Sequence, residues 1–411
     1  MTKSSANVKQ FAKVAWFVAP AVIVVPISAY AQTAPRVTVD VSVNGTADSN
    51  PFLEQGGVSS LSGTLQVDPR VYWEDETTNV VLESSLRMSQ YLRRYGSDIG
   101  GSVGVRANKQ LNARTSLTAA AGFLSSRSTL RDFFLGSLGA PLDPVEFPEA
   151  SFNDVTFAGR RTRVQTLNGS VGLNHVLGED DSISVNALTS YSRFSGPDQF
   201  DYRTGSLGAS YQRRLSERTT ISAGVTGTIA DYIGTKDGDA RIIGPQFGIE
   251  NKINERVSWT ASLGASVATV DNPLGVSRTK RYLTGNLSIC DRGVESALCG
   301  SVSRSAEPTS LGGIRAVTNL AVVFDKQLSA KDRVILSGRY GQTSQETSPT
   351  PLPGQGNTQL YGVSGTYSRD IGERLAFVVT PSFTKVVERR FRDEANYALT
   401  VGIRLRFGKL R

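Results

Sequence analysis

The stretch YALTVGIRLRF, from Tyr397 to Phe407, alternates apolar and polar residues from end to end. Successive side chains of a β-strand point to opposite faces, so this alternation predicts a strand with one apolar face and one polar face. Such a strand belongs either in a soluble β-protein, with its apolar face in the core, or in a membrane barrel, with that face against lipid. The rest of the chain decides between the two.

The same alternation recurs about every twenty residues along the chain. Three further clear examples are VTVDVSV from Val37, ISAGVTGTI from Ile221 and VSWTASLGASV from Val257. We predict about 18 such strands, with 16 as the alternative count, because an even number returns the last strand to the side of the first.

The connections between these segments are alternately short and long. A tight-turn phrase recurs in the short ones: KQLNARTSL from Lys109, RRLSERTTI from Arg213, NKINERVSW from Asn251, KQLSAKDRV from Lys326 and RDIGERLAF from Arg369. Long connections occupy residues 127–160, 271–280 and 344–356. Short periplasmic turns and long extracellular loops are typical of outer-membrane barrels. With aromatic residues near the strand ends and long strands, the pattern favours a transmembrane antiparallel up-and-down β-barrel over a soluble sandwich or β-helix.

Composition excludes several other classes of protein. The 411 residues are 39% hydrophobic, with a mean hydropathy of -0.19, which rules out a bundle of apolar transmembrane helices. The net charge is +8, but the cations are scattered rather than clustered, so we expect no nucleic-acid partner. One histidine and two cysteines suit neither a metalloenzyme nor a disulfide-dense module. We therefore expect no cofactor and no metal.

Residues 1–31 have the form of a cleaved signal peptide. Three lysines precede an apolar stretch from Ala15 to Ala29, and the sequence Ala-Tyr-Ala ending at Ala31 suits a signal peptidase. An uncleaved anchor is the alternative, which Pro20, Pro26 and the short apolar length disfavour. We expect a mature barrel of residues 32–411 that crosses the periplasm to a Gram-negative outer membrane.

The two cysteines, Cys290 and Cys299, flank the turn DRGVESAL and fall on the polar face of their two strands. Facing residues of a hairpin point the same way, so we predict a cross-strand disulfide near the periplasmic rim. It would stabilise the protein by about 2 to 3 kcal/mol. Catalytic redox cysteines are usually spaced as CxxC, which disfavours that alternative.

If the apolar face contacts lipid, the opposite face lines the lumen. Seven arginines fall on that face: Arg70, Arg87, Arg106, Arg315, Arg339, Arg404 and Arg406. They cluster on strands that barrel closure brings together, so they could form a basic wall selective for anionic or hydroxylated solutes. Equally, they could pair with Asp40, Asp68 and Glu83 and brace the wall. The sequence leaves both interpretations open.

Enzymatic functions are disfavoured. A triad-type hydrolase needs a base beside its nucleophile, and the single histidine, His175, falls on the apolar face at a turn. The aspartates of DYIGTKDGD, from Asp231, lack the ligand spacing of an EF-hand calcium loop. We expect that the protein is not an enzyme.

Two ends of the barrel resemble known families. The segment VTVDVSVNGTADSNPFL resembles the first strand and loop of porin-like barrels found with exopolysaccharide biosynthesis genes; Gly45, Asp48, Asn50, Pro51, Phe52 and Leu53 carry the match. That resemblance implies secretion or handling of a polysaccharide, with no established active site. The final strand resembles the C-terminal recognition strand of outer-membrane barrels, with Phe407 as its aromatic, although Gly408 to Arg411 follow. The implied partners are outer-membrane lipid, lipopolysaccharide and the barrel assembly machinery.

Two functions from different classes remain. One is a channel for polar solutes or for an exported, acidic exopolysaccharide. The other is a non-conducting barrel whose surface holds polysaccharide or a protein partner. The long extracellular loop at 127–160 bears on this choice because it is unusually apolar, with Phe133, Phe134, Phe147 and Phe152. It would be either a constriction in the lumen or a contact patch on the surface.

Overall fold

A computed structural model describes residues 35–127, 162–196, 199–233, 239–271, 277–310, 312–344, 357–388 and 392–408. Within these ranges, no helix is long and apolar enough to cross a membrane. The expected signal peptide and nearly all of the long loop at 127–160 lie outside the described residues.

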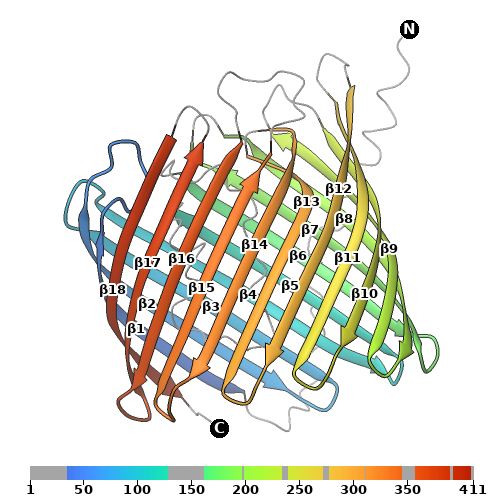
Figure 1. The fold of residues 1–411 in the computed structure, drawn as a ribbon, viewed down its shortest axis with the longest axis horizontal. Helices are drawn as coiled ribbons and strands as arrows, with labels where there is room; N and C mark the ends of the chain where they lie inside the picture. Colours follow the sequence, from blue (N-terminus) through green and yellow to red (C-terminus); the bar gives the residue numbers. More distant parts are fainter. Residues whose placement is uncertain are drawn as a thin grey trace.

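In the part of the chain that the structure describes, eighteen strands make up a single sheet (Figure 1), which confirms the predicted count over the alternative of 16. Their bounds are β1 Arg36–Asp48, β2 Ser60–Glu74, β3 Thr78–Tyr91, β4 Ser97–Asn112, β5 Thr115–Arg127, β6 Arg163–Val176, β7 Asp181–Phe194, β8 Asp201–Ser216, β9 Thr219–Ile233, β10 Ala240–Lys252, β11 Val257–Asp271, β12 Ser277–Arg292, β13 Ser296–Pro308, β14 Ile314–Gln327, β15 Asp332–Thr343, β16 Thr358–Asp370, β17 Leu375–Glu388 and β18 Arg392–Gly408.

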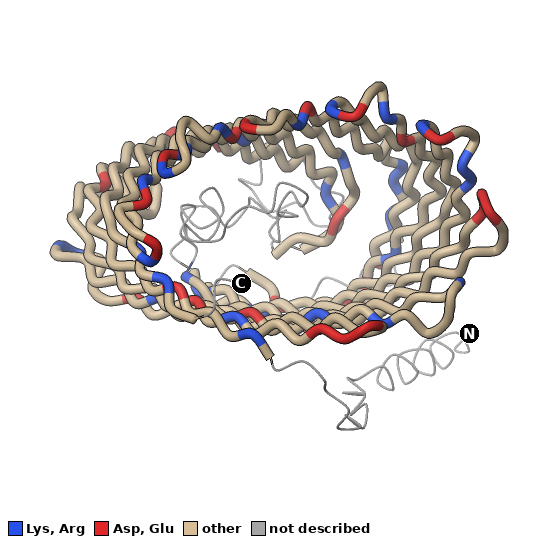
Figure 2. Tube along the Cα trace, turned by 90° about the horizontal axis from the view of Figure 1, so that it is seen from below, with Lys and Arg blue, Asp and Glu red and all other residues tan. Residues whose placement is uncertain are grey.

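The sheet closes into a barrel (Figure 2). Each strand pairs antiparallel with its neighbours in sequence, and β1 pairs with β18 through a ladder that sets Val39 against Phe407 and Asp40 against Arg406. Closure pairs the first and last strands with each other, so neither of them is left as an open edge of the kind that invites aggregation. The predicted up-and-down topology is therefore confirmed.

The alternation separates the two faces of the wall. On β1, Val37 and Val43 are 46% and 53% exposed on the outside, whereas Asp40 and Asn44 are buried on the inside. Large apolar side chains are exposed in the same way on the outer face of every strand pair, for example Leu263 on β11 and Leu283 on β12. An apolar outer surface of this extent is unstable in water and stable in lipid. The chain is a membrane-spanning barrel of the outer-membrane type.

Aromatic residues form two belts on the outer surface. The belt near the short turns contains Trp73, Tyr211, Trp259, Phe324, Tyr367, Phe377 and Phe407. The belt near the long loops contains Tyr191, Tyr340, Tyr361, Phe383 and Tyr397. On β18, Tyr397 and Phe407 are separated by a rise of about 25 Å once strand tilt is included, which matches the apolar band of an outer membrane.

The recurring turn phrase has a structural cause. Its central Asn or Ser side chain accepts hydrogen bonds from backbone N–H groups two and three residues later. Asn254 Oδ1 accepts from the N–H groups of Arg256 and Val257 at 2.8 and 2.7 Å. Ser216 and Ser329 do the same in their own turns. These side-chain turns explain why the periplasmic connections are short and alike.

The β1–β2 loop is built from the residues that resemble the exopolysaccharide-associated family. Asn50 exchanges hydrogen bonds with the backbone of Glu54, and its own N–H donates to Asn396 Oδ1 at 2.8 Å. Phe52 is fully buried against the rings of Tyr91 and Tyr95. In this chain the motif therefore anchors the first loop to β18 and to the β3–β4 connection.

Candidate functional site: the barrel lumen

Half of the lumen is lined by uncharged polar side chains. From β5 to β11, most inward side chains in the middle of the strands are Ser, Thr, Asn, Gln or Gly, with Ala120 on β5 and Leu188 on β7 as apolar exceptions. Asn168, Asn186, Thr226 and Gln246 are exposed there. Within this part of the wall, hydroxyl groups on adjacent strands form hydrogen bonds with one another. Three such pairs are Ser184 with Ser210, Ser190 with Thr204, and Ser206 with Thr228. We call this surface the hydroxyl wall.

The opposite half of the lumen is charged. The seven predicted arginines occupy inward positions on β2, β3, β4, β14, β15 and β18, which belong to one continuous arc of the barrel. The arc from β14 through β18 and β1 to β4 is called the charged wall below. The strand order places the predicted arginines on one side of the lumen. Their individual environments differ, as described next.

Arg406 and Arg70 each lie beside a carboxylate. Arg406 donates two hydrogen bonds to Asp40, at 2.7 and 3.2 Å, and the Asp40 carboxylate is almost fully buried. Arg70 lies 4.0 Å from Glu83, which is exposed to the lumen. Bidentate pairing makes Arg406 a brace between β18 and β1, as one of the two interpretations expects.

The charged wall contains more carboxylates and more arginines than the residues that the sequence analysis selected. Arg333 faces inward on β15, three periods of the alternation before Arg339, and forms a two-pronged contact with Asp325. Asp98, 4% exposed, accepts a 2.7 Å hydrogen bond from Arg163. Strict parity counting would have found Arg333 and Asp325. The arc is thus a wall of interleaved opposite charges rather than a basic wall.

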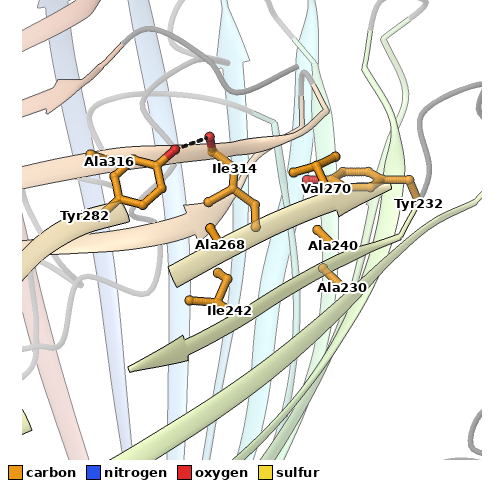
Figure 3. Packing of buried hydrophobic residues seen from close by; sticks show 9 residues of the cluster. All are labelled: Ala230, Tyr232, Ala240, Ile242, Ala268, Val270, Tyr282, Ile314 and Ala316. Atoms are coloured by element: carbon orange, nitrogen blue, oxygen red, sulfur yellow. Dashed lines mark hydrogen bonds between the residues drawn. The ribbon is translucent and has the colours of Figure 1, made fainter. Parts of the chain in front are cut away.

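The end of the β13–β14 hairpin folds into the lumen (Figure 3). The Tyr232 hydroxyl on β9 donates to the carbonyl of Gly313 at 2.6 Å, and the Tyr282 hydroxyl on β12 donates to that of Ile314 at 3.1 Å. The N–H of Phe200 donates to the carbonyl of Ser310 at 2.7 Å. These bonds tie the hairpin end to strands several positions away around the wall.

Apolar packing supports the same fold. Ile314 and Ala316 pack against a buried patch that the inner faces of four strands form: Ala230, Tyr232, Ala240, Ile242, Ala268, Val270 and Tyr282. Gly312 and Gly313 turn the chain with φ of +85° and +70°, which other residues rarely adopt. The hairpin end therefore narrows the lumen on its extracellular side. Arg315 is fully buried beneath the hairpin end, so its side chain does not line the accessible lumen.

The remaining predicted site residues have separate positions. Cys290 and Cys299 are directly opposed on β12 and β13 at the periplasmic end and are joined by a disulfide. Phe407 faces lipid in the periplasmic aromatic belt. Phe133, Phe134, Phe147 and Phe152 lie outside the described residues. His175 accepts or donates a 2.9 Å hydrogen bond with Thr115 on the outer face.

Among the described residues, no group of three or more His, Cys, Asp or Glu side chains is arranged to hold a metal ion. The hydroxyl wall can form hydrogen bonds with a solute in the lumen. The charged wall presents paired positive and negative side chains.

No family model matches the chain, and no curated protein matches its sequence. Solved structures resemble its fold. OccAB4 of Acinetobacter baumannii has 9% identity and a TM-score of 0.45, covering 92% of this chain and 100% of that one. The outer-membrane protein OpdK of Pseudomonas aeruginosa has 11% identity and a TM-score of 0.45, covering 90% and 99%. The FrpB iron transporter of Neisseria meningitidis has 9% identity and a TM-score of 0.44, covering 92% and 82%. No conclusion about a solute follows from similarities this distant.

Proposed function

We propose that this protein is an outer-membrane channel for small, hydroxylated polar solutes. The observation that carries the proposal is the hydroxyl wall, where inward Asn, Thr and Gln side chains remain exposed across β5 to β11. Several side chains of the charged wall, such as Asp40, Asp68 and Thr380, are instead buried, whereas Glu83 and Arg106 on the same wall are exposed. The uncharged part of the accessible lumen surface therefore belongs to the hydroxyl wall. Hydroxyl and amide groups both donate and accept hydrogen bonds, which suits a solute rich in hydroxyls.

Passage of a polysaccharide is the narrower form of this proposal. It rests on the family resemblance of residues 45–53 and on the same hydroxyl lining. The contacts of Asn50 and Phe52 are accounted for by loop anchoring, so they favour neither a polymer nor a small solute. An acidic polymer would also have to pass the interleaved carboxylates of the charged wall.

Single-channel recording of the purified, full-length barrel in planar bilayers tests the proposal. Stepwise conductance is expected for the wild type, with a larger step for the Y232F/Y282F variant, because loss of both hydroxyls releases the hairpin end from Gly313 and Ile314. Replacement of residues 309–313 by Asn-Gly, which suits a tight hairpin, should widen the lumen further. The lipid-facing Y211F variant is the matched control and should conduct like the wild type.

Deletion of residues 130–155 adds a second comparison. If neither this variant nor the hairpin variants conduct, the protein is not a channel and the alternative of a non-conducting binding barrel stands. Added neutral and acidic oligosaccharides then distinguish the two forms of the proposal. Block of the current by neutral sugars supports hydroxylated solutes, and block only by acidic oligomers supports an exported acidic polysaccharide.

A further inference from the structure

The recurring turn phrase carries an aliphatic residue at its third position, and the β6–β7 turn has one at the same place. The ladder puts these side chains on the lipid-facing side of the wall. Arg369, two residues before Ile371, pairs with the lipid-facing Phe377, and the N–H of Ile371 continues that ladder to the carbonyl of Leu375 at 2.9 Å. We call four such side chains, which are 46–59% exposed, the rim collar: Leu177, Ile253, Leu328 and Ile371.

The apolar band on the outer surface reaches full thickness only when the rim collar is included. On β16, Tyr361 and Tyr367 are six residues apart, which is about 15 Å along the membrane normal at a strand tilt of about 40°. Tyr361 and Ile371 are ten residues apart, about 25 Å, which is the height of the apolar band of an outer-membrane barrel. The same ten-residue spacing separates the first and last large lipid-facing apolar residues of two other strands and their turns: Leu167 and Leu177 of β6, and Ile243 and Ile253 of β10.

A polar residue interrupts each lipid-facing column two residues before the rim collar. On β10, the Asn251 side chain donates to the Thr219 hydroxyl, directly opposite on β9, at 2.8 Å. On β6, the His175 ring shares a 2.9 Å hydrogen bond with Thr115, directly opposite on β5. A polar group in water needs no such partner, whereas a polar group in lipid must be satisfied within the protein. The pairing is what a position inside the lipid boundary requires.

Two of these polar positions are charged, and they show the same arrangement. On β16, Arg369 lies 3.8 Å from Asp332, directly opposite on β15, and the Tyr367 hydroxyl donates to the same carboxylate at 2.6 Å. A second copy of this unit joins β8 to β7 and consists of Arg213, Asp181 and Tyr211. Each unit combines one positive and one negative side chain, so it lies beneath a lipid surface at a lower cost than a lone arginine.

We propose that the rim collar marks the hydrocarbon boundary of the inner leaflet on these strands, and that phospholipid acyl chains cover the collar and the polar pairs beside it. Leu111 and Leu215 occupy β-bulges at the corresponding place, so the aliphatic position recurs in six of the eight short turns. A bilayer surrounds a barrel on every side, whereas a second protein would contact only one sector. Lys326, which precedes Leu328, has a long side chain that carries its ammonium group past the collar to water.

Labelling of single introduced cysteines tests this placement, in nanodiscs that contain one full-length barrel and phosphatidylcholine. A C290S/C299S background removes both natural cysteines. The collar variants are I253C, L328C and I371C, and their matched controls are E255C, A330C and E373C, exposed positions two residues further along the same turns. The collar thiols should react with a charged maleimide at least about tenfold more slowly than the controls, because an apolar environment disfavours the reactive thiolate. Heat-modified migration on gels verifies that each variant is folded.

A pair replacement provides a second measurement that needs no label. T219V leaves the amide of Asn251 without its partner, whereas N251L/T219V makes both positions apolar. In lipid the double variant should be more stable than T219V, since an unsatisfied polar group costs more than its replacement by an apolar group. Urea unfolding in phosphatidylcholine vesicles gives the order of stability. The reverse order would contradict a position inside the lipid boundary.

Three labelling results would overturn the proposal. Equal rates for a collar thiol and its control in the same turn would place the collar in periplasmic water. Slow labelling of collar and controls alike would place the boundary beyond the ends of the turns. Fast labelling of the collar in nanodiscs, together with slow labelling in intact cells, would show that a periplasmic protein covers it instead of lipid. None of these measurements depends on whether the barrel conducts, so a failed channel proposal and a failed collar proposal are distinguishable.

Discussion

Asp40 is the residue whose environment depends most directly on barrel closure. Its buried carboxylate on β1 accepts two hydrogen bonds from Arg406 on β18, across the junction that closes the ring. A double-mutant cycle with D40N and R406Q should give a coupling free energy of about 1.5 to 3 kcal/mol, the range of hydrogen bonds to charged groups. Urea unfolding of the barrel in phospholipid vesicles, followed by tryptophan fluorescence, measures it.

A second ion pair that also involves β1, but joins it to β2, supplies the control. Arg36 on β1 lies 3.0 Å from Glu74 on β2, and both side chains are more than half exposed. Solvent screens such a pair, so a cycle with R36Q and E74Q should give a coupling of about 1 kcal/mol or less. Equal coupling in the two cycles would show that burial at the closing junction contributes nothing.

The environment of Asp75 in the β2–β3 turn predicts that the stability of the protein depends on pH. Its carboxylate accepts hydrogen bonds from the backbone N–H groups of Thr77 and Thr78 at 2.8 and 2.6 Å, and these bonds hold the pKa of Asp75 below its ordinary value of 3.8. A lowered pKa in the folded state means that the stabilisation is full above 3.8 and is lost as pH falls through the folded pKa.

The D75A variant isolates this effect from the other carboxylates. The wild type should be more stable than D75A at neutral pH, and the difference should shrink as the pH is lowered below 3.8. Urea midpoints of both proteins across an acidic pH series measure that difference. A difference that stays constant with pH would mean that the Asp75 carboxylate does not support the turn.

At the scale of the strand pair, the disulfide joins β12 to β13 below the point where the two strands diverge. Cys290 and Cys299 close a loop with a sequence separation of 9. The C290S/C299S variant should lose about 2 to 3 kcal/mol of unfolding free energy, since the bond restricts the unfolded chain. Unfolding with and without reductant measures the loss. Reductant should leave the variant unchanged, and two free thiols in protein prepared without reductant would refute the bridge.

The strands and the turns were predictable because they depend on local sequence. Alternation fixes which side chains share a face, and the Asn or Ser of the turn phrase satisfies backbone groups within three residues, as Asn254 does. The inward fold of the β13–β14 hairpin was not predicted. Its contacts join Tyr232, Val270 and Ile314, which lie on separate strands and become neighbours only when the barrel closes. Apolar residues on the lumen parity were the signal in the sequence.

At the scale of the whole molecule, two unlike walls enclose the lumen. The predicted grouping of arginines on one side follows from strand order, which sequence parity and an even strand count supply. The predicted basic character does not follow, because Arg333 pairs with Asp325 and Arg406 with Asp40 on the same arc. Which inward carboxylate reaches which arginine depends on side-chain geometry that parity does not contain.

If the barrel conducts as proposed, the interleaved charges predict weak ion selectivity, and removal of a single charge in the lumen should shift that selectivity toward anions or toward cations. Glu83 on β3 and Arg106 on β4 are both exposed and face the lumen on adjacent strands. E83Q should shift permeability toward chloride and R106Q toward potassium, each by about twofold, since a charge beside a pore attracts its counterion. Reversal potentials in a KCl gradient measure both shifts.

The double variant decides whether lumen charge sets the selectivity. E83Q/R106Q removes one charge of each sign and should return the reversal potential close to that of the wild type. R213Q, on the lipid-facing side of β8, changes the net charge equally but lies outside the lumen and should produce no shift. A shift in R213Q would mean that ions respond to the net charge of the protein. Shifts of the same sign in E83Q and R106Q would mean that the charge of these two side chains does not set the selectivity. The two-wall arrangement predicts opposite shifts because Glu83 and Arg106 carry opposite charges and both face the water-filled lumen from the charged wall.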